Sequence, residues 1–138
     1  MNEQQNLSIV RNAYDAFGRG DIPGLLGLLD DRVSWVTPGP ADLPTAGTRK
    51  GHDDVQEFFL ALSGLVDIVR FEPKEFIAQG DRVVVIGDDT TRVKATGRTI
   101  ELRWVHAFTV LNGKVAAFEE YGDVSALVAE VRSAQARV

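Results

Sequence analysis

The first half of the chain places its apolar residues at helical spacing. Between residues 3 and 17 they recur at steps of three and four: Leu7, Val10, Ala13, Tyr14 and Phe17. This pattern predicts an amphipathic helix, which the glycines at 18 and 20 would end. Asp21 as N-cap and Pro23 in the first turn predict a second, short helix that runs through Leu29 and ends before Asp30.

A short alternating stretch, residues 33–37, predicts the first strand. The Gly-, Pro- and Thr-rich stretch 38–51 then predicts a loop, which is either a lid over a pocket or a plain connection. Asp53 and Asp54 open a third predicted helix, residues 55–65, because acidic side chains favour a helix N-terminus. Its apolar stripe includes Phe58.

The second half alternates with a period of two. Four strands are predicted, at residues 66–78, 82–94, 99–111 and 114–121, with turns at 79–81, 96–97 and Asn112-Gly113 between them. Such short connections predict an antiparallel meander. Asp123 or Ser125 would then cap a final helix.

Helices followed by a long sheet predict an α+β fold, with a single domain over residues 1–138. We expect three N-terminal helices to wrap around a curved sheet, and a short C-terminal helix to follow. A cone of this kind has a mouth, and an apolar mouth with a few polar groups is the usual form of a small-molecule site.

Composition narrows the classes of function. The formal net charge is −5 and the 15 Lys and Arg residues are scattered, which argues against nucleic acid or an anionic membrane as partner. The absence of cysteine excludes disulfides, thiolate catalysis and cysteine-based metal sites. The N-terminus is polar, and no run approaches the roughly 18 apolar residues of a membrane span, so a cytoplasmic protein is expected.

The most informative stretch is 97–123, where ionisable and aromatic side chains occupy strands. Leu102, Trp104, His106 and Phe108 share one strand face by alternation. A buried histidine beside a tryptophan needs a partner or a ligand. By the same alternation Glu120 shares a face with Phe118, so His106 and Glu120 are the leading acid-base candidates.

Asp89 is a third candidate, since it has the parity of Val83 and Val85, although a bulge at residues 87–89 would reverse it. Further side chains would line a cavity for flat apolar ligands: Tyr14, Trp35, Thr37, Phe58, Leu102, Trp104 and Phe118. His52 precedes two acids, but these begin a helix, so no metal site is expected there.

Several segments carry a resemblance to a known family: GDIPGLLGLLDDRVSW, the Gly51-His52 turn before VQEFF, AQGDRVVV and NGKVAAFEEYGD. From about Leu7 to Val131 the chain resembles the NTF2-like superfamily, and most nearly its SnoaL-like and ketosteroid-isomerase-related branch. The resemblance implies the cone fold and a homodimer through the outer sheet face, with Val105, Ala107, Tyr121 or Arg103 at the interface. It does not imply one activity, because the superfamily includes isomerases, cyclases, epoxide hydrolases, dehydratases and non-catalytic subunits.

Two enzyme patterns of the family are incomplete in this chain. The ketosteroid isomerase positions fall at Tyr14, His106 and Thr37, and a threonine cannot replace the aspartate base, so that mechanism is not expected. Tyr14 and His106 could still bind an oxyanion together. The epoxide hydrolase carboxylates fall at Asp89 and Glu120, but Gly87 stands where the bridging arginine belongs. Trp35 and Thr37 likewise replace the tyrosine and asparagine that hold the water.

SnoaL-type cyclases use an aspartate or histidine without metal or organic cofactor, and the resemblance therefore implies none here. Our first hypothesis is an acid-base enzyme of isomerase, cyclase or hydrolase type that acts on an apolar cyclic substrate. His106, Glu120 and Asp89 would transfer protons and Tyr14 would orient the substrate. The alternative is a non-catalytic ligand-binding or dimeric scaffolding domain.

Overall fold

The computed structural model describes residues 2–136 as four helices and six strands. The helices are α1 (Glu3–Gly18), α2 (Ile22–Leu26), α3 (Gly51–Leu65) and α4 (Ser125–Ala136). The strands are β1 (Leu29–Thr37), β2 (Gly47–Lys50), β3 (Val66–Gln79), β4 (Arg82–Val93), β5 (Thr99–Leu111) and β6 (Lys114–Gly122).

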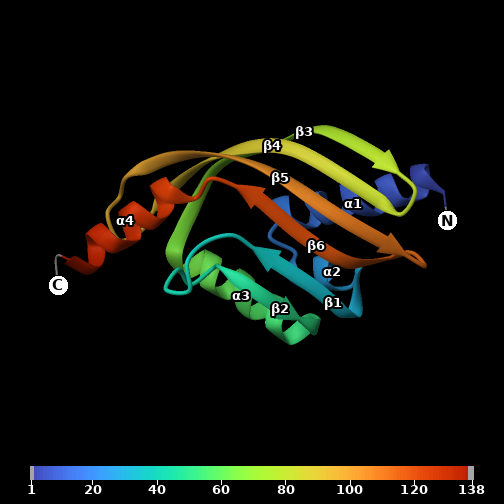
Figure 1. Ribbon diagram of the computed structural model, residues 1–138, viewed down its shortest axis with the longest axis horizontal. Coiled ribbons are helices and arrows are strands. Elements are labelled where there is room, and N and C mark those ends of the chain that lie inside the picture. Colours follow the sequence, from blue (N-terminus) through green and yellow to red (C-terminus); the bar gives the residue numbers. More distant parts are fainter. Residues whose placement is uncertain (1, 137–138) are drawn as a thin grey trace.

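The six strands form one mixed sheet in the order β2-β1-β6-β5-β4-β3. The pair β1 and β6 is parallel, and all the others are antiparallel. In Figure 1 the long strands β3 to β6 arch over α1 and α2, while α3 lies by β1 and β2, and α4 continues from β6 at one end. The predicted α+β fold, with its antiparallel meander and final helix, is confirmed.

The boundary between α2 and β1 differs from the prediction. The helix ends at Leu26, not at Leu29, and the strand begins at Leu29, not at residue 33. The backbone N–H of Val115 donates to the carbonyl of Leu28 at 2.9 Å, and Leu29 pairs with Val115 in β6. Pairing with a strand far along the sequence thus overrides the local helical pattern.

Strand β2 lies in the stretch that was predicted to be a loop. It consists of Gly47, Thr48, Arg49 and Lys50, which offer no apolar alternation to detect. It is the edge strand beside β1, and α3 follows it directly at Gly51. The remaining connection is tied down as well, since Leu43 is buried in a small cluster with residues of α4.

The hairpin between β5 and β6 turns where the sequence predicts. Asn112 and Gly113 both have positive φ, 52° and 79°. A two-residue turn with two left-handed residues is the type that matches the twist of paired strands, and Asn-Gly is its preferred sequence. This turn brings β6 back beside β5.

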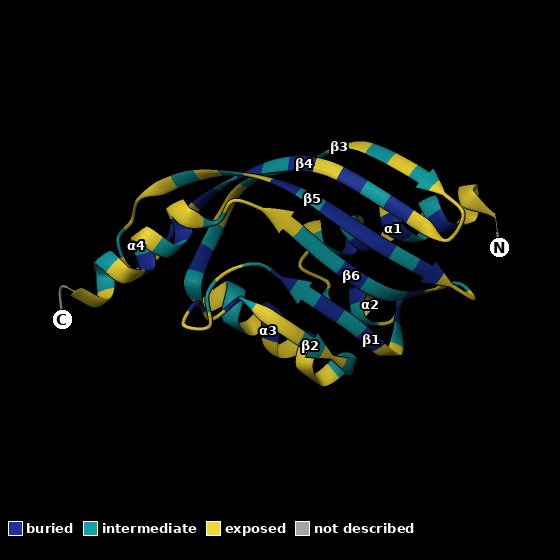
Figure 2. Cartoon of the chain, in the orientation of Figure 1, coloured by how far each residue is buried: buried dark blue, intermediate teal, exposed yellow. Residues whose placement is uncertain are grey.

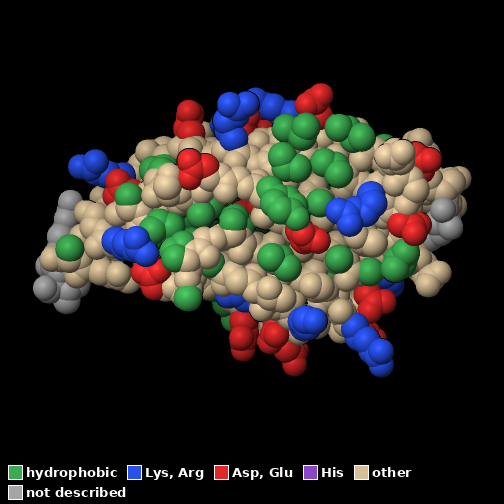
Figure 3. Space-filling view, in the orientation of Figure 1, with side chains coloured by type: hydrophobic (Ala, Val, Ile, Leu, Met, Phe, Trp, Pro, Cys, Tyr) green, Lys and Arg blue, Asp and Glu red, His purple; other side chains and the backbone are tan. Residues whose placement is uncertain are grey.

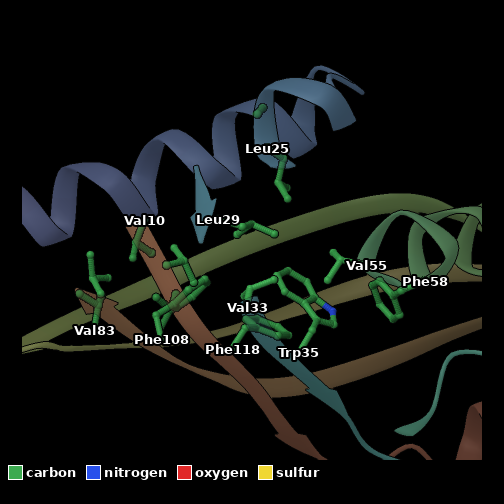
Figure 4. Packing of buried hydrophobic residues seen from close by; sticks show 14 of the residues in the cluster. Val10, Leu25, Leu29, Val33, Trp35, Val55, Phe58, Val83, Phe108 and Phe118 are labelled. Carbon is green, nitrogen blue, oxygen red and sulfur yellow. The ribbon is translucent and has the colours of Figure 1, made fainter. Parts of the chain in front are cut away.

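The main core lies between the helices and the concave face of the sheet. Val10, Val33, Val55, Val83 and Val115 are fully buried there, and Figure 4 shows part of this packing. Figure 2 shows buried residues alternating with more exposed ones along β4, as expected for a sheet with one covered face. Among residues 2–136, none of the helices combines the length and apolar character needed to cross a bilayer.

Candidate active site

A cavity of about 140 Å³ lies inside the cone, between the concave sheet face and the helices. Its size is close to that of an apolar cavity that holds one aromatic ring. All ten side chains predicted for the site contribute to its wall: Tyr14, Trp35, Thr37, Phe58, Asp89, Leu102, Trp104, His106, Phe118 and Glu120. The wall is mostly apolar and carries a few polar groups.

Three of these residues form a hydrogen-bonded chain across the cavity. The Tyr14 hydroxyl lies 2.7 Å from Nδ1 of His106, and Nε2 of His106 lies 2.9 Å from a carboxylate oxygen of Glu120. The His106 side chain is 7% exposed, whereas that of Glu120 is 26% exposed. The chain therefore runs from the buried His106 to the more open side of the cavity at Glu120.

The carboxylate fixes the direction of this chain. An ionised Glu120 can only accept, so Nε2 of His106 carries the proton and Nδ1 is left as an acceptor for the Tyr14 hydroxyl. Burial raises the pKa of Tyr14 well above its usual range, and the negative charge of Glu120 raises that pKa further. Tyr14 is consequently a neutral phenol at rest.

A β-bulge places Glu120 opposite His106. Near the turn Val110 pairs with Val115, but the register shifts so that Thr109 pairs with Ala117 and His106 with Glu120. Directly paired residues share a sheet face, so Glu120 points into the cavity with His106. Without the extra residue the side chain of Glu119 would take this place.

Asp89 has a separate pair of partners in the same cavity. Its two oxygens accept from the Thr91 hydroxyl at 2.6 Å and from Trp104 Nε1 at 3.1 Å. Burial raises the pKa of the Asp89 carboxyl, and the nearby charge of Glu120 acts in the same direction. The β4–β5 register is continuous, so no bulge reverses the inward direction of Asp89.

The Trp104 indole lies between two glycines. Its direct partners are Gly87 in β4 and Gly122 in β6. A Cβ atom added at Gly87 would overlap the Trp104 ring and the Glu72 carbonyl oxygen. The glycine at the position of the missing arginine thus gives the indole the space from which it reaches Asp89.

The aromatic walls of the cavity are nearly flat. The Trp104 ring stacks on the His106 ring at a centroid distance of 3.9 Å, and the Tyr14 ring lies at the edge of the imidazole, 5.9 Å away; each is inclined to the imidazole by 10°. Trp35 and Phe118 stack at 4.0 Å on the neighbouring strands β1 and β6. Such walls favour planar ligands.

The other predicted residues occupy the wall without joining the hydrogen-bonded chain. Phe58 packs edge-on against Phe59, and Leu102 is half-buried. Thr37 is buried, and its hydroxyl donates to the carbonyl of Thr45, so it is not a free polar group.

Among the cavity residues that were not predicted, two contact the predicted polar and aromatic groups directly. Thr91 supports Asp89, and its position two residues further along the same strand was a usable signal. Phe71 stacks on Trp104 at 5.0 Å from β3, where two register shifts hide the alternation.

His52 has a structural role. Its Nε2 lies 2.9 Å from the carbonyl oxygen of Leu29 and so links α3 to β1. Within the described residues, no group of three or more His, Asp or Glu side chains is arranged to hold a metal ion.

A family model described as "SnoaL-like domain" matches residues 10–118. No curated protein matches the chain significantly.

Solved structures match over almost the full length. An NTF2-like protein from Burkholderia xenovorans LB400 is 43% identical, with 94% of this chain and 97% of that one covered and a TM-score of 0.85. An NTF2-like protein of unknown function from Burkholderia pseudomallei K96243 is 34% identical, with 96% and 97% covered and a TM-score of 0.83. TerC, co-crystallised with polyporic acid, is 32% identical, with 93% and 98% covered and a TM-score of 0.84. The NTF2-like fold expected from the resemblance is confirmed.

Proposed function

This chain belongs to the SnoaL-like domain family, and from that premise and its cavity we propose an enzyme that moves protons on a small, planar, apolar cyclic substrate. The observation that carries the proposal is the hydrogen-bonded chain Tyr14–His106–Glu120 at the wall of an aromatic cavity. Isomerase-, cyclase- and hydrolase-type reactions all need such a proton transfer.

The reacting group would be the Tyr14 oxygen. Tyr14 takes a proton from a substrate carbon or hydroxyl while its own proton passes to Nδ1 of His106. The resulting imidazolium is stabilised by the Glu120 carboxylate, 2.9 Å from Nε2. Because the pKa of Tyr14 is strongly raised, a free phenolate is unfavourable and the two transfers are coupled.

The relatives support the substrate class. TerC, at 32% identity, was co-crystallised with polyporic acid, so a cyclic organic ligand is a reasonable choice for this cavity too. A cyclic compound of about one ring is therefore a suitable first ligand for binding trials with this chain, because the cavity has that size.

Proton exchange tests the proposal before the substrate is known. β-Tetralone, a cyclic ketone with acidic ring protons, is incubated with the protein in deuterated water, and loss of those protons is followed by proton NMR. We expect the wild type to accelerate exchange, and Tyr14→Phe and Glu120→Gln each to lower that rate about 100-fold or more. Glu119→Gln is the matched control, since Glu119 is the neighbour on β6 and pairs with Ala107, not with His106.

Two results of this experiment would overturn the proposal. If the two cavity variants exchange at the rate of the wild type or of the Glu119→Gln control, Tyr14 and Glu120 do not transfer the proton. A wild type with no acceleration over buffer would reject the proposed chemistry for this type of carbon acid.

A non-catalytic binding role is the second candidate. It is favoured by Thr37, whose hydroxyl is occupied at the position where related isomerases carry the base. In that case a small cyclic ligand would bind tightly and be recovered unchanged after prolonged incubation.

A further inference from the structure

One polar group in the cavity wall has no partner. Among residues 2–136, Trp35 Nε1 is the single buried side-chain nitrogen or oxygen atom without a hydrogen bond, and Trp35 is 5% exposed. An indole N–H can only donate. Left unpaired, it loses its hydration without compensation, so such a group in a native structure calls for an explanation.

Within residues 2–136, no oxygen accepts a hydrogen bond from this N–H. On the same face of β1, the Thr37 hydroxyl is directed to the Thr45 carbonyl, which also accepts from Arg49. Aromatic rings surround the indole instead, at centroid distances of 5.9 Å for Phe58 and 5.6 Å for Phe59. In Figure 4 the indole nitrogen lies on the ring edge that faces Phe58, and both side chains line the cavity. An aromatic face is a much weaker acceptor than an oxygen.

The other indole of the chain, that of Trp104, does have a hydrogen-bond acceptor. Trp104 lines the same cavity, and its Nε1 donates to Asp89 at 3.1 Å. The fold therefore supplies a carboxylate to one indole and nothing to the other.

Phe118 separates Trp35 from the proton-transfer chain. Its ring stacks on Trp35 at 4.0 Å and contacts the His106 ring edge-on at 4.8 Å. A planar ligand lying against Phe118 would thus have the Tyr14–His106–Glu120 chain on one side and the Trp35 N–H on the other.

We propose that Trp35 Nε1 is a specificity-determining donor that binds a carbonyl or hydroxyl oxygen of the ligand, on the opposite side of Phe118 from His106. The ligand is then a planar cyclic compound with two oxygen functions on different edges. One faces Tyr14 and the other faces Trp35. This inference rests on the proposed function for the first oxygen only.

Two probes of the same shape test whether Trp35 Nε1 binds the second oxygen of the ligand. para-Hydroxyacetophenone carries a carbonyl that para-isopropenylphenol replaces with a methylene group of similar shape. The chain has two tryptophans, so NH-correlation NMR shows two indole signals, and the spectrum of Trp35→Phe assigns them. Both probes are titrated into the wild type and the Trp35→Phe variant.

We expect the carbonyl probe to move the Trp35 indole proton downfield and the methylene probe to leave it nearly unchanged. Trp35→Phe, which keeps an aromatic ring, should weaken the carbonyl probe about tenfold and the methylene probe less than about twofold. Equal losses for both probes would overturn the proposal, because they would show that Trp35 acts by packing alone. Binding of both probes weaker than about 10 mM would overturn it too, since a ligand of this size in a fitting cavity should exceed that.

The outcomes separate the two proposals. If Tyr14→Phe leaves proton exchange unchanged while the Trp35 signal responds to the carbonyl probe, the proposed reaction fails and the donor role stands. If exchange depends on Tyr14 and Glu120 but the two probes behave alike at Trp35, the reaction stands and the second oxygen is rejected.

Discussion

Two carboxylates share the cavity but have different partners. Glu120 accepts from an imidazole that can become a cation, whereas Asp89 accepts only from the neutral groups of Thr91 and Trp104. A carboxylate among neutral partners in an apolar wall is stabilised less as an anion. Asp89 is thereby suited to keep its proton to a higher pH than an ordinary carboxyl group.

This difference predicts how Asp89→Asn affects stability. Because burial raises the pKa of Asp89, the folded protein keeps this proton to a higher pH than the unfolded chain does. The stabilisation that the bound proton gives to the folded state is fully present below the ordinary carboxyl pKa. It is lost as the pH rises through the raised pKa of Asp89 in the folded protein. An asparagine imitates the neutral acid at every pH, so the variant should gain stability over the wild type as the pH rises above the ordinary carboxyl pKa.

Denaturant unfolding at several pH values measures this difference, with Asp88→Asn as the matched control. Asp88 lies next to Asp89 but points outward, and hydrogen bonds from Lys74 and Arg70 lower its pKa. Its stabilising effect is present above the ordinary carboxyl pKa and disappears at lower pH, so Asp88→Asn should have the opposite dependence. Parallel curves for the two variants would contradict our account of Asp89.

For single residues, the alternation along the strands predicted which side chains point into the cavity. Counting from Phe118 gave the inward direction of Glu120, and counting along β5 gave that of His106. The family resemblance placed Tyr14 and His106 at one site, but no local pattern predicts their direct hydrogen bond, because it joins a helix to a strand 92 residues away. The unpaired Trp35 N–H was also beyond local pattern, since it reflects the absence of an acceptor in three dimensions.

At the scale of secondary structure, strands β4 and β6 each carry a local feature where they flank β5. Gly87 and Gly122 flank Trp104, and the bulge in β6 sets the side-chain direction of Glu120. Bulges and interior glycines commonly mark sites where a strand is reshaped to aim a side chain.

Adding one methyl group at Gly87 should therefore displace the Trp104 ring, which lines the cavity. A Cβ there would overlap both the Trp104 ring and the backbone of β3, so we expect Gly87→Ala to destabilise the fold by about 1–3 kcal/mol. Gly64→Ala is the control with the opposite sign. A Cβ at Gly64 in α3 meets no atom within 4 Å, and alanine in a helix should stabilise by about 0.5–1 kcal/mol.

Thermal unfolding followed by circular dichroism compares the two alanine variants. The Trp104 indole NMR signal should also shift in Gly87→Ala, because the ring must move relative to Asp89. A Gly87→Ala protein as stable as wild type, with an unchanged Trp104 signal, would refute the packing argument.

The elements also show where sequence patterns stop being informative. Four long strands and α1 follow strong periodicities and were predicted within a few residues. β2 has no apolar residue, and its pairing depends on β1, so nothing local indicates it. The start of β1 at Leu29 is likewise decided by β6, not by the leucine-rich segment itself.

At the scale of the whole molecule, the outer face of the sheet carries exposed apolar side chains. Alternation and pairing direct Ile77, Val84, Ile86, Val105 and Tyr121 away from the core, and we call these the outer patch. Ile77, Ile86 and Tyr121 are 52%, 37% and 55% exposed. Figure 3 shows hydrophobic side chains grouped over β4 and β5 on this face. Of the residues expected at an interface, Ala107 is already covered, at 7% exposure.

We propose that the outer patch binds a second copy of the chain. The wild type should sediment as a dimer, and Ile86→Lys should sediment as a monomer, because a charge at the centre of an apolar contact cannot be paired. Leu60→Lys is the control, since Leu60 is 64% exposed on α3, away from this face. A wild type that stays monomeric at about 100 µM in analytical ultracentrifugation would rule out an interface of useful affinity.

The stack of Trp104 on His106, at 3.9 Å and 10°, gives this protein a built-in optical probe. A protonated imidazole accepts an electron from an excited indole and so quenches its fluorescence, whereas a neutral imidazole does so weakly. Trp104 emission should therefore fall when His106 gains a proton, and Trp35→Phe removes the other indole from the spectrum. The charge on the central residue of the proton-transfer chain can thus be followed by light, before any substrate has been identified.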